Sequence, residues 1–396
     1  MRCCVAGGGP AGMMLGLLLA RSGVEVLVLE KHADFLRDFR GDTLHPSTLE
    51  VMHELGLLPD LLRLPHAEAR QISAQIGDVS LPFADFTHLP TRCRFLAFMR
   101  QWDFLNLLAE HAGRYPQFRL RMRAEVTTLI EDAGRITGLR ATIPEGQLEV
   151  RADLIVGADG RHSRTRAAAR LEVREFGAPM DVLWFRLSRR ETDPAETMGR
   201  FYPGGLLVLI DRGEYWQCGL VIPKGANERI RERGLPAFRD EIARLVPFAA
   251  DRVVELRDWE MIKLLSVQVD RLPRWSRPGL LCIGDAAHAM SPVGGVGINL
   301  AIQDAIAAAR FLAAPLREGR LTEADLQRVQ RRRELPTRVT QRLQLLVQNR
   351  VIKRVLGSTQ TLSPPLALRL LARIPWLRRI PARLIGLGVR AEHVGH

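Results

Sequence analysis

The apolar residues of the chain gather in short runs, and three of these runs end in turns that carry glycine and aspartate. A short apolar run bounded by glycine predicts a buried strand. The runs cover residues 3–6, 154–156 and 280–283, and the turns after them read Gly7-Gly-Gly-Pro-Ala-Gly12, Gly157-Ala-Asp-Gly160 and Gly284-Asp-Ala-Ala-His288. Three patterns of this kind predict three strand ends that converge on one extended ligand.

The first turn has the glycine spacing of a dinucleotide-binding motif. Gly7 permits a tight turn, Gly9 lets the backbone approach a pyrophosphate, and Gly12 lets the next helix pack on the strand. A second apolar run, 24–29, ends at Glu30, 18 residues beyond Gly12, where a carboxylate is expected to bind ribose hydroxyls. We predict that FAD binds here; the alternative is a glycine-rich turn without a ligand. The candidate contacts are Gly7, Gly9, Pro10, Ala11, Gly12, Glu30 and Lys31.

Elsewhere the spacing of apolar residues predicts alternating helices and strands. Helical spacing covers residues 13–20, 48–56, 102–114, 235–245 and 298–312. Strand-like alternation occupies 70–98, a β-meander is predicted over 118–156, and residues 178–268 are rich in strands. We expect the strand-rich region to form an antiparallel sheet that covers the ligand and holds a substrate.

Length and composition limit the class of protein. A chain of 396 residues predicts two domains and an appendage. No run of 18 or more uncharged apolar residues occurs, so no membrane span is expected, and the first strand begins too early to leave room for a signal peptide. The five cysteines lack C-x-x-C spacing, which favours a reduced, cytoplasmic protein without a zinc site.

The net charge of +13 belongs to the C-terminal segment. Residues 310–396 contain 18 Arg and Lys against 5 Asp and Glu, and the rest of the chain is balanced. Apart from Phe311, the only aromatic residue of the segment is Trp376, and it contains no nucleic-acid motif. No nucleic-acid partner is therefore expected. Pro375 and Pro381 should interrupt any long helix there.

Three interpretations of this basic segment stay open. It could be a solvated helix face, or it could contact an anionic membrane peripherally, because Leu and Ile mix with Arg over residues 366–389. The third interpretation is packing on the body of the protein or on a second subunit. We favour packing, because Leu and Ile at helical spacing are more often core. The residues concerned are Leu366, Leu370, Leu371, Ile374 and Leu377.

Over roughly residues 1–315 the chain resembles the FAD-dependent aromatic hydroxylases of the para-hydroxybenzoate hydroxylase fold, the group A flavoprotein monooxygenases. The resemblance rests on the first turn with Glu30, and on three further motifs. These are Asp153-Leu-Ile-Val-Gly-Ala-Asp159-Gly-Arg-His-Ser163, Gly284-Asp-Ala-Ala-His288-Ala-Met-Ser-Pro292 and Gly294-Gly-Val-Gly-Ile-Asn-Leu-Ala301.

The resemblance implies an α/β (α+β) fold in three parts. A discontinuous, Rossmann-like FAD-binding domain would cover 1–68, 99–177 and 270–313. An inserted, mostly antiparallel substrate domain would cover 69–98 and 178–269, and 314–396 would form a basic, helical C-terminal segment. It also implies hydroxylation of an aromatic or polyketide-like small molecule with O2 and transient NADH or NADPH, through a flavin C4a-hydroperoxide.

The same resemblance supplies further cofactor-binding candidates. Asp159 would shape the pyrophosphate and nicotinamide loop, and Asp285 would accept hydrogen bonds from the ribityl hydroxyls; helix capping is the alternative for both. Arg40 would face the pyrophosphate side or the nicotinamide, or be a surface arginine. His288 is interpreted as structural. The remaining candidates are Arg100, Gln101, Val126, Pro292, Gly295, Gly297, Ile298 and Asn299.

No catalytic acid or base can be named from the sequence. Tyr202 and Tyr215 lie in the expected substrate sheet and His45 follows Arg40, but packing is the simpler role for the tyrosines. Two alternatives in function remain: a flavin-dependent halogenase or reductase, and a non-catalytic flavin-binding interaction protein. The segment Tyr215-Trp-Gln-Cys to Ile222-Pro223 is only weakly similar to the halogenase W-x-W-x-I-P element, because its first tryptophan is absent.

Overall fold

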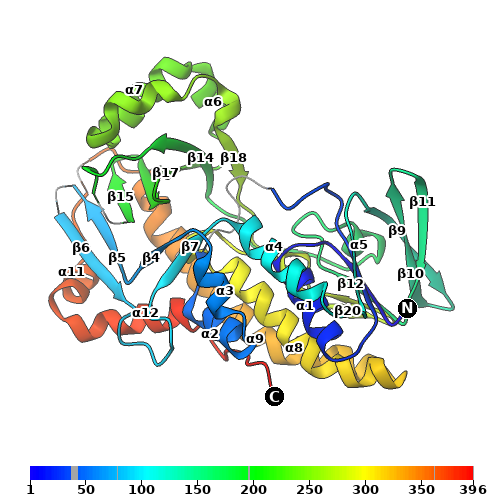
Figure 1. Ribbon diagram of the computed structural model, residues 1–396. Helices are drawn as coiled ribbons and strands as arrows, with labels where there is room; N and C mark the ends of the chain where they lie inside the picture. Colours follow the sequence, from blue (N-terminus) through cyan, green and yellow to red (C-terminus); the bar gives the residue numbers. More distant parts are fainter. Residues whose placement is uncertain (37–42, 78, 195–196, 361, 396) are drawn as a thin grey trace.

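Two sheets dominate the architecture of this computed structural model, which describes residues 1–36, 43–77, 79–194, 197–360 and 362–395 (Figure 1). A six-stranded, mainly parallel sheet has the order β20-β21-β12-β1-β2-β8. A seven-stranded, mainly antiparallel sheet has the order β18-β14-β17-β16-β15-β5-β6. The first lies to the right of Figure 1 and the second to the upper left.

The parallel sheet brings the three turns together. Its strands are β1 (Cys3–Ala6), β2 (Val26–Leu29), β8 (Phe118–Arg121), β12 (Leu154–Gly157), β20 (Ser276–Arg277) and β21 (Leu280–Cys282). Ala6 is opposite both Gly157 and Leu29, and Gly157 is opposite Cys282. Because these strands are parallel, the turns that follow them leave the same edge of the sheet. The predicted convergence of three strand ends is confirmed.

The predicted meander over 118–156 is wrong at its beginning. Its first segment, β8, pairs in parallel with β2 and so belongs to the parallel sheet. The meander itself consists of β9 (Glu125–Asp132), β10 (Arg135–Ile143) and β11 (Gly146–Arg151). Leu139 and Ala141 of β10 pack against Cys4 and Ile155, so the meander covers one face of the parallel sheet.

Helices cover the other face. They are α1 (Pro10–Arg21), α4 (Gln101–Ala112), α8 (Gly297–Glu318) and α9 (Glu323–Val347), with α2 (Pro46–Glu54), α3 (Leu58–Arg63) and α5 (Arg164–Ala168) nearby. Helix α1 packs between α8 and α4. Helix α8 is apolar and long enough to cross a membrane, but 72% of its most apolar window is buried within the protein. Its apolar character therefore reflects its central place in the core.

The seven-stranded sheet has two different faces. Its strands are β5 (Gln71–Ile76), β6 (Val79–Asp85), β14 (Met180–Ser188), β15 (Met198–Tyr202), β16 (Gly205–Asp211), β17 (Tyr215–Pro223) and β18 (Lys263–Ser266). One face buries Phe185 and Trp216 against α6 (Asn227–Glu232), α7 (Leu235–Leu245) and η1 (Pro247–Glu255). The other face packs Val182 and Val221 near Val293, in the glycine-rich segment before α8.

Short elements connect the two sheets. β3 (Thr43–Leu44), β4 (His66–Ala69) and β7 (Leu96–Met99) form a three-stranded sheet, and β13 (Arg174–Glu175) pairs with β19 (Asp270–Arg271). The short 3₁₀ turns are η2 (Trp259–Met261), η3 (Gly284–Ala286) and η4 (Val293–Gly295). β7 thus pairs with β3 and β4, whereas β5 and β6, from the same strand-like stretch, belong to the seven-stranded sheet.

The C-terminal part breaks into short helices, as the prolines predict. After α9 come η5 (Gln348–Ile352), α10 (Lys353–Leu356), α11 (Leu366–Arg373), η6 (Pro375–Arg378) and α12 (Arg379–Gly386). Helices α11 and α12 both contact β6, so this part packs on the body of the protein. Leu366 and Leu370 do not pack on the body of the protein, because both side chains are exposed, whereas Leu371, Ile374 and Leu377 are half-buried. Packing of the two exposed leucines on a second subunit stays a prediction.

Candidate functional site

Three of the four glycines of the first turn differ in the space around them. A Cβ at Gly7 would lie 2.4 Å from the carbonyl oxygen of Ala158, and a Cβ at Gly12 would lie 1.9 Å from that of Gly7. Gly7 also has a φ of +105°, which favours glycine. A Cβ at Gly9 would meet no protein atom within 4 Å. The protein therefore needs glycine at positions 7 and 12, whereas the space beside Gly9 is open at the N-terminus of α1.

Glu30 lies beside this open space. It follows β2 and is buried, and its carboxylate accepts hydrogen bonds from the backbone N–H groups of Gly8 (2.9 Å) and His32 (3.1 Å). These contacts fix the side chain at the edge where the first turn leaves the sheet. Pro10 and Ala11 form the first turn of α1, Lys31 is exposed, and Arg40 lies outside the described residues.

The second turn is held by Asp159. Its carboxylate accepts hydrogen bonds from the backbone N–H of Thr165 (3.0 Å) and from the Thr165 hydroxyl (2.7 Å), and also from Ser163. Ser163 itself caps α5 by accepting from the N–H of Arg166. Asp159 thus ties the second turn to the start of α5, as the capping alternative predicts. Its role at the pyrophosphate and nicotinamide stays a prediction.

The third turn places Asp285 beside the second. Its carboxylate lies 3.6 Å from the guanidinium of Arg161, and both side chains are partly exposed. The N-cap residue of η3 is Ile283, and Asp285 lies inside this 3₁₀ turn. This position disfavours the capping alternative, and the carboxylate contacts Arg161 of the second turn.

The segment before α8 is shaped by glycines and by Asn299. Gly294 and Gly295 have φ values of +79° and +63°. The side-chain oxygen Oδ1 of Asn299 accepts hydrogen bonds from the backbone N–H of His45 (2.8 Å) and from the Thr48 hydroxyl (2.7 Å). The side-chain nitrogen Nδ2 donates to the backbone oxygens of Thr43 and Gly295. Since the side chain of Asn299 is used within the protein, its backbone is the part available to a ligand.

A row of glutamines on α9 supports the same segment from behind. Gln344 donates to the backbone oxygens of Ser291 and Val293, both at 2.9 Å, and accepts from the N–H of Ser291. Gln341 donates to the backbone oxygens of Asp270 and Ala289. These residues are not among the candidates that the sequence predicts; their only signal in the sequence is glutamine at helical spacing in an arginine-rich helix.

A buried network of charges fixes the third turn. Asp304 on α8 accepts from the N–H of Gly284 (3.1 Å) and contacts His288 Nε2 (2.6 Å) and Arg333 Nε (3.0 Å). Arg333 also reaches Glu392 near the C-terminus (3.4 Å). Burial alone would raise the pKa of Asp304, but His288 and Arg333 outweigh it and hold that pKa below its usual value. His288 is therefore a structural residue, as the sequence indicated.

The other candidates lie on elements around this edge. Arg100 is the N-cap residue of α4, with its guanidinium 5.5 Å from the ring centre of Trp102, and Gln101 begins the helix. Val126 is buried in β9 opposite Ala141. Pro292 precedes η4, and Gly297 and Ile298 begin α8.

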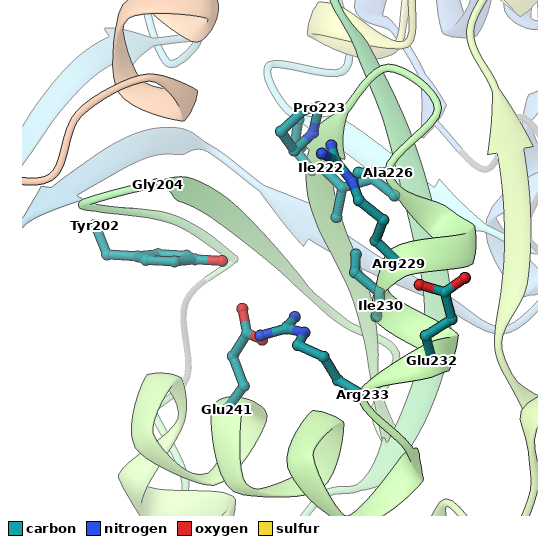
Figure 2. Close-up of a pocket in the computed structure, with 11 residues that line it drawn as sticks. Tyr202, Gly204, Ile222, Pro223, Ala226, Arg229, Ile230, Glu232, Arg233 and Glu241 are labelled. Atoms are coloured by element: carbon teal, nitrogen blue, oxygen red, sulfur yellow. The ribbon is translucent and has the colours of Figure 1, made fainter.

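The two tyrosines differ in position. Tyr202 points into a cavity of about 440 Å³ between β15, β17 and the helices α6 and α7, beside Arg233 and Glu241 (Figure 2). This cavity is on the sheet face that packs against α7, away from Val293, and burial raises the pKa of Tyr202 well above its usual value. Tyr215 begins β17, with the guanidinium of Arg186 4.9 Å from its ring centre. Tyr202 is therefore poorly placed to act on a ligand at the three turns.

His45 is buried beside the segment before α8, and its titration provides a test. Its Nδ1 lies 2.7 Å from the backbone oxygen of Ile385 on α12. Burial lowers the pKa of His45 to about 4, although backbone hydrogen bonds at Ile385, Gly294 and Gly295 oppose the shift. The histidine pKa in the unfolded state is near 6.5. Between pH 6.5 and 4, His45 is therefore protonated in the unfolded state but neutral in the folded state.

We expect the free energy of unfolding to fall by up to about 3 kcal/mol from this residue as the pH drops through that window. His45→Gln should lose less stability on acidification than the wild type, measured by urea unfolding at pH 7.5 and 4.5. His53→Gln, at a half-buried position on α2, is the control. Equal acid sensitivity of wild type and His45→Gln would contradict the expectation.

Comparison with known proteins adds to this geometry. A family model described as "FAD binding domain" matches residues 1–343. The 6-methylpretetramide 4-monooxygenase of Streptomyces rimosus is 34% identical over 389 residues, which cover 96% of this chain and 91% of that protein. The rifampicin monooxygenase of Streptomyces venezuelae is 29% identical, with 78% of this chain and 63% of that protein covered.

Solved structures share the fold. PqsL, a probable FAD-dependent monooxygenase from Pseudomonas aeruginosa, gives a TM-score of 0.75 at 21% identity and covers 90% of this chain and 98% of its own. The Diels-Alderase PyrE3 gives a TM-score of 0.77 at 21% identity, covering 100% of this chain and 82% of its own. At these identities the structures support the fold alone.

Proposed function

Because this chain belongs to the FAD binding domain family and is an FAD-dependent monooxygenase, we propose that its substrate is a flat, polycyclic, polyketide-like aromatic molecule and that the three turns hold the FAD. The observation that carries this proposal is the meeting of the three turns at one sheet edge, next to an apolar sheet face that packs near Val293. O2 and NADH or NADPH are the co-substrates.

Each group at the turns has a task in binding FAD. The open space beside Gly9 receives the pyrophosphate, where the N-terminus of α1 favours negative charge. Glu30 accepts from ribose hydroxyls, and Asp285 accepts from the ribityl chain. Arg100, Gln101 and the backbone of Val126 extend the site toward the ribityl and adenine ends. The residues that the sequence selected around them are Gly7, Pro10, Ala11, Gly12, Lys31, Arg40 and Asp159.

The N-terminus of α8 is the group proposed to act on the flavin. Bound FAD would supply the redox chemistry. The backbone N–H groups of the first turn of α8, at Gly297, Ile298 and Asn299, would stabilise negative charge on it. Pro292 and Gly295 let the chain pass close to the ring, and Gln344 fixes the backbone at Val293.

The substrate is proposed to lie between this segment and the seven-stranded sheet. Trp184 and Val208 pack in two apolar clusters, one near Val293 and the other with Phe98 of β7. A surface of this kind suits an extended aromatic ring system better than a small charged phenol. The 34% identity to the 6-methylpretetramide 4-monooxygenase supports a substrate of this class.

The test follows NAD(P)H oxidation and product mass together. We expect polycyclic phenols to accelerate NADPH or NADH oxidation and to gain one oxygen atom from isotopically heavy O2, while single-ring phenols do neither. A protein that binds FAD but consumes no nicotinamide with any substrate would be a flavin-binding protein without turnover. Conversion without an added oxygen would indicate chemistry like that named for the Diels-Alderase neighbour. Either result would overturn the proposal.

We also propose a cytoplasmic location. All five cysteines are buried free thiols, and burial raises the pKa of Cys4 to about 12. A chain that uses its cysteines as buried apolar residues fits a reducing compartment.

A further inference from the structure

The C-terminal helices expose apolar side chains that the reaction does not use. Leu366 is 77% exposed, Leu370 53%, Trp376 61%, Ile380 53% and Leu384 44%. We call these five side chains, with the arginines between them, the tail surface. Isolated exposed leucines are common, but five large apolar side chains within 19 consecutive residues are a patch.

Helix α12 has two apolar sides, and only one is covered. Ala382 and Gly386 are buried, and a Cβ at Gly386 would meet Leu89 at 2.7 Å, so this side faces β6 and its neighbours. Ile380 and Leu384 are one turn apart and lie on the opposite side of the helix. Ile380 and Leu384 therefore do not belong to the edge of the core; they form a second apolar face of α12 that is exposed to solvent.

Helix α11 presents the same combination of residues. Leu366 and Leu370 share one helix face with Arg369 and Arg373, since the four recur at intervals of three and four residues. Helix α11, η6 and α12 all contact β6 (Figure 1). The tail surface is thus carried by structured helices fixed to an edge strand.

The positive charge around the tail surface favours a negatively charged partner. Residues 335–391 contain 11 Arg and Lys and no Asp or Glu. A two-fold contact between two copies of this surface would bring arginines against arginines, which opposes self-association. Interleaved Arg, Leu and Trp on short surface helices suit a negatively charged interface whose interior is apolar.

We propose that the tail surface docks the enzyme peripherally on a bilayer that contains anionic lipid. The apolar side chains enter the boundary between headgroups and acyl chains, and the arginines, Arg369, Arg373, Arg379 and Arg383, contact lipid phosphates. The backbone oxygen of Ile385 on α12 is 2.7 Å from His45 beside the segment before α8. Docking therefore brings the side of the protein next to the candidate site toward the membrane, where apolar substrates dissolve.

The experiment measures co-sedimentation of the full-length holoenzyme with phosphatidylglycerol–phosphatidylcholine vesicles and with phosphatidylcholine alone. We expect binding to the anionic vesicles that weakens with salt, because exposed charges are screened over about 8–10 Å near 0.1 M salt. Leu370→Ser/Trp376→Ser should weaken binding at every salt concentration, by about tenfold per side chain. Arg373→Glu/Arg379→Glu should abolish the preference for anionic lipid.

The control is Val254→Ser/Leu264→Ser, two exposed apolar positions on η1 and β18. It should bind vesicles as the wild type does, and every variant should keep its flavin spectrum and melting temperature. Failure of the wild type to bind anionic vesicles at low salt would overturn the proposal. So would a wild-type dimer, seen by sedimentation velocity, that Leu370→Ser/Trp376→Ser dissociates, because the occupant would then be a second copy of the chain.

Discussion

Gly9→Glu is expected to give a folded protein that binds no FAD. The backbone at Gly9, with φ −74° and ψ −175°, is open to any residue, and a Cβ there meets no protein atom within 4 Å. The new carboxylate would instead enter the space proposed for the pyrophosphate. Like charges about 4 Å apart repel by about 4 kcal/mol near a protein surface, roughly a thousandfold in Kd.

The measurement is titration of apoprotein with FAD, together with circular dichroism to establish that the variant folds. Gly9→Ala should fold and bind FAD more weakly than the wild type but better than Gly9→Glu. Gly12→Ala is the contrasting control: its Cβ would collide with the backbone oxygen of Gly7, so the fold itself should lose stability. Stoichiometric FAD in folded Gly9→Glu would show that the pyrophosphate does not lie beside the first turn.

The meeting of the strand ends was predictable because each turn has a complete local signal. An apolar run sets a buried strand, and glycine or aspartate ends it. The parallel arrangement then requires the ends at Ala6, Gly157 and Cys282 to lie at one edge. The start of α8 and the bounds of α7 followed from local signals in the same way.

Partner choice between distant segments was not predictable. The run that forms β8 has the same alternation as the meander strands. Its pattern does not show that it pairs with β2, where Val26 is opposite Phe118, 92 residues later in the chain. Helical spacing likewise shows that Leu366 and Leu370 share a face, but not whether another element covers that face.

The hydrogen bonds from α9 that support the site were also not predictable from the sequence. Gln344 reaches Ser291 across 53 residues, and Arg333 reaches Asp304 across 29. Glutamine and arginine on a helix usually indicate a solvated face, and these residues are buried only because the helix lies against the turns. The sequence thus identifies the groups proposed to face the ligand more readily than the groups that hold them in place.

Asp304→Leu is expected to cost about 3–5 kcal/mol of stability, because removing one member of a buried charge network leaves His288 without its partner and Arg333 with Glu392 alone. The N–H of Gly284 also loses its acceptor, so FAD affinity should fall as the third turn loosens. Urea unfolding and FAD titration measure the two effects. Glu318→Leu is the matched control on the same helix, since its pair with Arg320 is at the surface and worth at most about 1 kcal/mol.

The pH dependence of the stability difference between wild type and Asp304→Leu shows whether the charge of Asp304 causes that difference. The pKa of Asp304 is lowered in the folded protein, so its contribution is fully present above the ordinary carboxyl pKa and is lost as the pH falls through the lowered value. The stability gap between wild type and Asp304→Leu should therefore be constant near neutral pH and should narrow only in acid. Asp304→Leu/Arg333→Leu should recover part of the loss, because the buried guanidinium that had lost its Asp304 partner is gone. A gap that does not narrow in acid, with no recovery in the double variant, would mean that Asp304 contributes packing and not charge.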